Sequence, residues 1–189
     1  MNIFDIHTTE TAQAPAAEML GEIEKAYGFI PNLYGVFAES PTVLKAYLVI
    51  GKLFDESSFS ATERQLVILA ASRFNECKYC VASHSVVAGM QRVPDDVIEA
   101  IRNDRPIADG KLQALRTFTT AIVEKRGWVS DEDSTSFLAA GYTKAQILEV
   151  ILGVSFKTLS NYTNHIADTP LDVAFEAGAW SPVAKRLAS

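Results

Sequence analysis

The chain has 189 residues, of which 48% are apolar and 21% are charged, an ordinary balance for a globular protein with one sizeable core. Its net charge of −6 argues against nucleic acid as a main partner, because phosphate binding needs a basic surface. An acid, Asp5, stands where a signal peptide would carry a base, and no long apolar run follows it. We therefore expect a cytoplasmic protein that does not span a membrane.

The apolar pattern is helical along nearly the whole chain, and no segment alternates apolar and polar residues as a strand would. Residues 1–13 are polar and are predicted to form an extended arm. Four helices should follow, each beginning near a proline or a capping box. They are predicted from Ala14 to Gly28, from Pro31 through Phe37, from Pro41 to about Asp55, and from the capping box Ser60–Glu63 to about Phe74.

The second half of the chain continues in the same way. Asn75 is predicted to cap a helix from about Glu76 to Gln91. Further helices are expected from Pro94, over 111–126, from Ser130 to just before Gly141, from the capping box Thr143–Gln146 to Ile166, and from Pro170 through Trp180. No low-complexity linker interrupts the pattern, so residues 1–189 are predicted to form one all-α domain of many helices, and the family resemblance described below implies that they pack as an orthogonal bundle.

A weak internal repeat accompanies this pattern. A shift of about eighty residues places Thr62 on Thr143, Gln65 on Gln146 and His84 on His165. The same shift places the two cysteines on Thr158 and Asn161. If the repeat is real, the second copy keeps the helical scaffold without the thiols.

Both cysteines of the chain lie in one short segment that also holds a histidine. Cys77, Cys80 and His84 have the spacing Cys-x-x-Cys-x-x-x-His, which on a helix puts Cys80 and His84 on one face and Cys77 nearby. Two cysteines in a reducing compartment are not a structural staple, so redox chemistry or metal binding is favoured. The second thiol can resolve an oxidised first thiol as a disulfide.

The spacing alone leaves open which thiol is the nucleophile. With Asn75 as the cap, Cys77 lies at the start of the helix, where unpaired backbone N–H groups favour a thiolate. Cys80 is instead within reach of His84, which can accept a thiol proton near neutral pH. A zinc site is a further alternative, with His165 as a possible fourth ligand if the repeat folds over.

The segment from Thr62 to His84 resembles the carboxymuconolactone decarboxylase-like family, in its alkylhydroperoxidase D-like, peroxidase-related branch. Gly28-Phe29-Ile30-Pro31-Asn32-Leu33 and Gly141-Tyr142-Thr143 are similar to the same branch. The resemblance implies an AhpD-like helical fold, assembled as a homo-oligomer such as a trimer or hexamer. It also implies a hydroperoxide substrate and a thiol protein as reductant. We expect no bound cofactor and no metal.

The resemblance further implies roles for four residues. Cys80 attacks the peroxide, Cys77 closes the disulfide and His84 belongs to a proton relay. The relay glutamate of the family corresponds to Gln65, whose amide can orient a partner but cannot act as a base. Two alternatives remain open: a dithiol–disulfide oxidoreductase acting on a protein, and a decarboxylase-like enzyme that does not need the thiols.

Overall fold

The computed structural model describes residues 3–182, and every regular element among them is helical. The prediction of an all-α fold is therefore confirmed. The elements are α1 (Ala14–Tyr27), α2 (Asn32–Phe37), α3 (Pro41–Asp55), α4 (Ala61–Phe74), α5 (Lys78–Met90), α6 (Asp95–Arg102), α7 (Gly110–Glu124), α8 (Asp131–Ala139), α9 (Lys144–Ala167) and the 3-10 helix η1 (Val173–Gly178).

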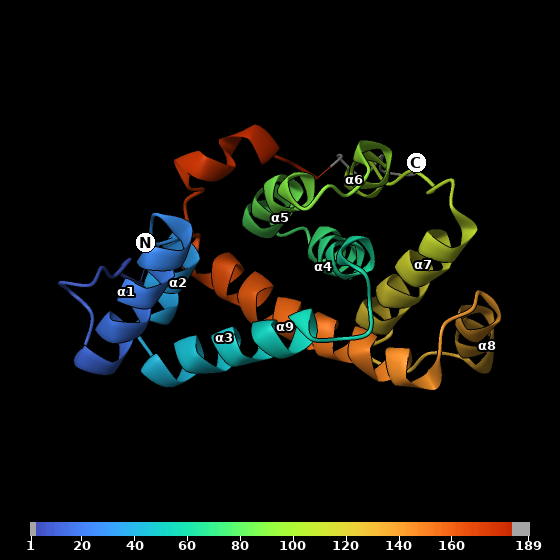
Figure 1. Cartoon of the computed structure of the whole chain (residues 1–189), viewed down its shortest axis with the longest axis horizontal. Helices are drawn as coiled ribbons and strands as arrows, with labels where there is room; N and C mark the ends of the chain where they lie inside the picture. Colours follow the sequence, from blue (N-terminus) through green and yellow to red (C-terminus); the bar gives the residue numbers. More distant parts are fainter. Residues whose placement is uncertain (1–2, 183–189) are drawn as a thin grey trace, which may run out of the picture.

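The core is built around α4, which packs against α5, α6, α7 and α9 (Figure 1). Every residue of α4 from Gln65 to Ser72 is buried, because neighbouring helices cover it on all sides. The long helix α9 runs beneath α4 and alongside α3, and η1 covers the outer side of α5. This arrangement places α5 between α9 and the C-terminal segment.

The predicted capping boxes form as expected. The Ser60 side chain accepts a hydrogen bond from the Glu63 backbone N–H, and the Glu63 carboxylate accepts one from the Ser60 backbone N–H. Thr143 and Gln146 make the same reciprocal pair at the start of α9. Each box satisfies backbone N–H groups that the first turn leaves unpaired, so both helices begin where the sequence predicts.

Two predicted boundaries are wrong. Asn75 ends α4 instead of capping α5, because Glu76 adopts a left-handed backbone with φ of 56° and breaks the helix there. Helix α5 therefore begins at Lys78, with Cys77 as its N-cap residue. The last predicted helix is only the 3-10 helix η1, since the preceding Asp172 turns inward to accept hydrogen bonds from the Tyr79 hydroxyl and the Asn32 backbone N–H.

The proposed repeat stays a prediction. Its two halves differ in helix continuity. The break between α4 and α5 corresponds to the middle of α9, which is unbroken. The break is therefore what gives α5 its own N-terminus, and the thiols lie at that new helix start. Within residues 3–182 no single helix is long and apolar enough to cross a membrane; only α8 and α9 taken together, bent by 112°, reach that length and hydropathy.

We expect Gly153→Ala to lower the free energy of unfolding by about 1–3 kcal/mol, the usual cost of overpacking a core. A Cβ atom at Gly153 of α9 would lie 2.7 Å from the Phe54 ring and 2.8 Å from Val67. Gly89→Ala in α5 is the matched control, because nothing lies within 4 Å of its Cβ position. The control should gain about 0.5–1 kcal/mol from helix propensity. Chemical denaturation of both variants would test this, and equal effects would contradict it.

Candidate active site

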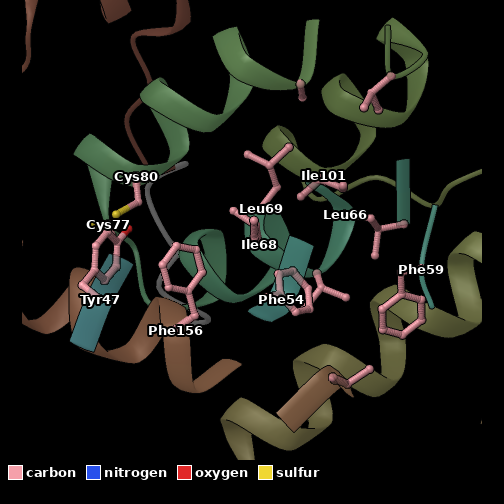
Figure 2. Close-up of a cluster of buried hydrophobic side chains, with 14 of the residues drawn as sticks. Tyr47, Phe54, Phe59, Leu66, Ile68, Leu69, Cys77, Cys80, Ile101 and Phe156 are labelled. Carbon is pink, nitrogen blue, oxygen red and sulfur yellow. The ribbon is translucent and has the colours of Figure 1, made fainter. Parts of the chain in front are cut away.

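The two thiols lie at the N-terminus of α5, in the interior of the protein (Figure 2). Cys77 is the N-cap residue and Cys80 is the third residue of the helix, within the first turn. Each is 1% exposed, and both are free thiols that hydrogen-bond to each other. The helix start therefore favours a thiolate at Cys80 as well as at Cys77, because the unpaired N–H groups of the first turn lie around both residues.

The opposite wall of the site comes from one face of α9. Lys157 is followed on this face by Ser160, Asn161 and Asn164, which lie three, four and seven residues after it, and all four are buried. The Asn164 amide nitrogen lies 3.2 Å from the Cys80 sulfur and 3.8 Å from the Cys77 sulfur. The Ser160 hydroxyl lies 3.7 Å from the Cys80 sulfur. This face supplies hydrogen-bond donors to a negative charge on Cys80.

A chain of polar contacts runs through His84, one turn after Cys80 on α5. Gln65 donates from its amide nitrogen to the Gln91 side-chain oxygen at 3.2 Å, which leaves its own oxygen facing His84 Nδ1, also at 3.2 Å. His84 Nε2 lies 3.1 Å from the Lys157 ammonium nitrogen. The partners fix the tautomer: Nδ1 carries the proton and donates to Gln65, while Nε2 accepts from Lys157.

The surroundings shift the pKa values of the two thiols in opposite directions. Burial opposes charge on Cys80, but hydrogen bonding from Cys77, the positive charge of Lys157 and hydrogen bonds from α9 outweigh it and lower the pKa of Cys80 to about 5. The pKa of Cys77 is raised, because its thiol donates a hydrogen bond to Cys80 and because it is buried. At neutral pH the site therefore holds a Cys80 thiolate and a Cys77 thiol.

Burial and nearby charges also determine the protonation states of the His84 and Tyr47 side chains. The pKa of His84 is held well below its usual value by burial and by the Lys157 charge, so the imidazole is neutral. The pKa of Tyr47 is raised by burial and by the charge of Cys80, so its phenol keeps its proton beside the thiolate. Among these groups Lys157 is the positive charge that balances the thiolate.

A pocket of about 500 Å³ opens beside Cys77. Its walls come from the start of α5, the end of α9 and the C-terminal segment. The lining residues include Cys77, Tyr79, Asn164, His165, Leu171 and Trp180. Cys80 is not among them, so the pocket reaches the dithiol from the Cys77 side.

Of the four site residues predicted from the sequence, Cys77 contacts Cys80, and His84, one turn after Cys80 on α5, contacts Gln65. Tyr79, which stands between the two cysteines in the sequence, donates its hydroxyl to Asp172 at 2.6 Å and anchors the C-terminal segment. His165 is exposed and makes no contact with His84, so it does not extend the polar chain.

Lys157 and Ser160 are site residues that the sequence motif does not indicate. Their signal was present, because Lys157 lies four residues before Asn161 and seven before Asn164, on one polar stripe of an otherwise apolar helix. Lysines on helices are usually exposed. Lys157 is buried because α9 packs against α4 and α5, which the sequence does not reveal.

The zinc alternative finds no support in the geometry. Among residues 3–182 no group of three or more His, Cys, Asp or Glu side chains is placed to hold a metal ion. His84 Nε2, the nitrogen that would face a metal, lies against the Lys157 ammonium instead. A cation at that position repels a second cation.

Residues 41–121 match the carboxymuconolactone decarboxylase family, and this segment contains both cysteines, His84 and Gln65. No curated protein has a matching sequence. The fold is similar to the alkylhydroperoxidase AhpD core of a peroxidase-related protein from Ralstonia eutropha, with a TM-score of 0.80, 18% identity, and coverage of 91% of this chain and 93% of that one.

Two further solved structures share the fold. A peroxidase-related protein from Silicibacter sp. matches with a TM-score of 0.74 and 16% identity, covering 84% of this chain and 85% of that one. A debrominase matches with a TM-score of 0.72 and 17% identity, covering 87% and 88%. The same debrominase has also been solved with 2,3,4-tribromopyrrole. Residues 41–121 thus resemble the carboxymuconolactone decarboxylase family, and the chain has an AhpD-like all-helical fold.

Proposed function

We propose that this protein is a thiol-dependent peroxidase that reduces hydroperoxides through a Cys77–Cys80 dithiol–disulfide cycle. The observation that carries the proposal is the position of Cys80. Its sulfur lies in the first turn of α5, next to a second thiol, an amide donor at 3.2 Å and a buried lysine. This is the environment of a reactive cysteine, which needs a stabilised thiolate within reach of a resolving thiol.

The cycle has three steps. The Cys80 thiolate attacks one oxygen of the hydroperoxide, the O–O bond breaks, and a sulfenic acid and an alcohol form. The Cys77 thiol then attacks the sulfenic sulfur, and a disulfide and one water form. An external dithiol reduces the disulfide. It attacks Cys77 from the pocket, because Cys80, the thiol of lower pKa, is the better leaving group.

Gln65 and His84 act in this scheme through position. A glutamine at the site of the family glutamate cannot accept a proton near neutral pH, but its oxygen holds the His84 ring by the Nδ1 contact. His84 in turn contacts Lys157 through Nε2, so the glutamine and the imidazole together position the lysine side chain. Self-association into trimers or hexamers, a thiol protein as reductant and a cytoplasmic location stay predictions.

The direct test is to mix reduced protein with an organic hydroperoxide. We expect one disulfide per chain, seen as a mass loss of two hydrogen atoms and as loss of both free thiols, with release of one alcohol. Thiols that stay free after exposure would overturn the proposal. Turnover of a protein disulfide without peroxide reduction would favour the oxidoreductase alternative, and an activity that survives loss of both cysteines would favour a decarboxylase-like enzyme.

A further inference from the structure

Lys157 is a fully buried lysine, with 0% of its surface exposed. Its ammonium contacts the neutral nitrogen His84 Nε2 at 3.1 Å and lies 5.0 Å from the centre of the Phe156 ring. None of the ion pairs within residues 3–182 includes Lys157. A buried cation without a carboxylate is costly, so its charge needs another partner.

The packing of α5 on α9 provides that partner. Cys80 and His84 lie one turn apart on α5, and Lys157 and Ser160 lie one turn apart on α9. Ser160 contacts Cys80, and Lys157 contacts His84, so the same two helix faces meet at both points. Across this contact the positive charge of Lys157 acts on the Cys80 sulfur and lowers its pKa.

We propose that Lys157 and the Cys80 thiolate form a buried ion pair that stores one proton, and that Lys157 releases this proton when Cys80 loses its charge. Lys157 then acts as the acid of the peroxidase cycle, so this inference rests on the proposed function for its role in turnover. In the first step, Cys80 thiolate, hydroperoxide and Lys157 ammonium give Cys80 sulfenic acid, alcohol and neutral Lys157 amine. Disulfide formation with Cys77 then releases water, and reduction by a dithiol restores the ion pair.

The other groups around the pair do not take over this role. Cys77 and Tyr47 keep their protons beside the thiolate, for the reasons given above. Burial and the contact with Asp172 also raise the pKa of Tyr79. Its hydroxyl donates a hydrogen bond to the Asp172 carboxylate. His84 is neutral next to Lys157.

Gln65 fits the same scheme. A glutamate at this position would place a permanent negative charge one histidine away from Lys157, and would balance the ammonium whether or not Cys80 was charged. With an amide there, the thiolate is the balancing charge, and its loss leaves the buried ammonium unpaired.

The test combines two measurements on the whole protein between about pH 6 and 8, using dithiothreitol and no peroxide. Ultraviolet absorbance reports the thiolate in the reduced protein, and a redox titration gives the disulfide potential. Each proton taken up on reduction changes the equilibrium constant tenfold per pH unit, about 30 mV for a two-electron couple. We expect a full thiolate signal and yet a slope of two protons, about 59 mV per pH unit, because the second proton goes to Lys157.

Lys157→Met should remove the thiolate signal at neutral pH while keeping the fold, since methionine fills a similar buried space. Lys144→Met is the matched control, because it removes an exposed lysine from the same helix, and it should change neither measurement. A one-proton slope in the unaltered protein would overturn the inference, as the lysine would then stay charged in the disulfide form. A thiolate signal that persists in Lys157→Met would also overturn it. Because no peroxide is used, a protein without peroxidase activity can still pass this test.

Discussion

Replacing Cys80 by serine is expected to lower hydroperoxide consumption at least about a thousandfold, because the attacking sulfur is lost and a neutral hydroxyl cannot replace it. Replacing Cys77 by serine should have a different result. The first step remains, so the Cys80 sulfenic acid accumulates after a single turnover and the cycle stops there. A sulfenic-acid trapping reagent and mass measurement distinguish the two variants, alongside the rate of peroxide loss with dithiothreitol as reductant.

The roles follow from where α5 begins. Cys80 receives hydrogen bonds from Cys77 and from α9, whereas Cys77 donates and has a raised pKa. Met90→Ser is a suitable control, because it replaces an exposed sulfur at the other end of the same helix and should leave the rate unchanged. A trapped sulfenic acid in Cys80→Ser, with none in Cys77→Ser, would reverse the two roles.

The fold was largely predictable from sequence, because its signals are local. Prolines, capping boxes and apolar stripes mark the starts and faces of the helices, and each depends only on residues a few positions apart. The C-terminal segment was the exception. Pro170 resembles a helix start, but Asp172 makes contacts with Asn32 and Tyr79, which are distant in sequence, and these hold the backbone out of a helix.

The site was predictable only as far as the thiol motif itself. Cys77, Cys80 and His84 stand within eight residues, so their spacing reveals their common face. The order of the two thiol pKa values depends on Lys157 and on the left-handed residue Glu76, which moves the start of α5 by two positions. The first is a contact between helices eighty residues apart, and the second is a conformation that glutamate rarely adopts. Neither leaves a local signal.

The rate of the first step is expected to be independent of pH between about 6 and 8, and to fall tenfold per unit below about 5, because Cys80 reacts as its thiolate. The sign follows from the direction of the shift: a lowered thiol pKa means that the charged form persists to lower pH. His84 adds no inflection in this range, since its pKa is held well below its usual value. An ordinary cysteine, with a pKa of about 8.5, would instead speed up about tenfold per unit from pH 6 to 8.

The shape of the profile is more informative than the rate itself. At pH 6 a thiol with a pKa of about 5 is about 90% thiolate, against about 0.3% for an ordinary thiol, a gain of about 300-fold in the reactive form. The lower basicity of such a thiolate reduces its intrinsic nucleophilicity by about 40-fold at the sensitivity known for thiol exchange, so the net gain is only about tenfold. Single-turnover measurements on Cys77→Ser isolate this step. A rate that rises steadily to pH 8 would show that the attacking thiol lacks the lowered pKa, and that the contacts from α9 do not stabilise a thiolate at Cys80.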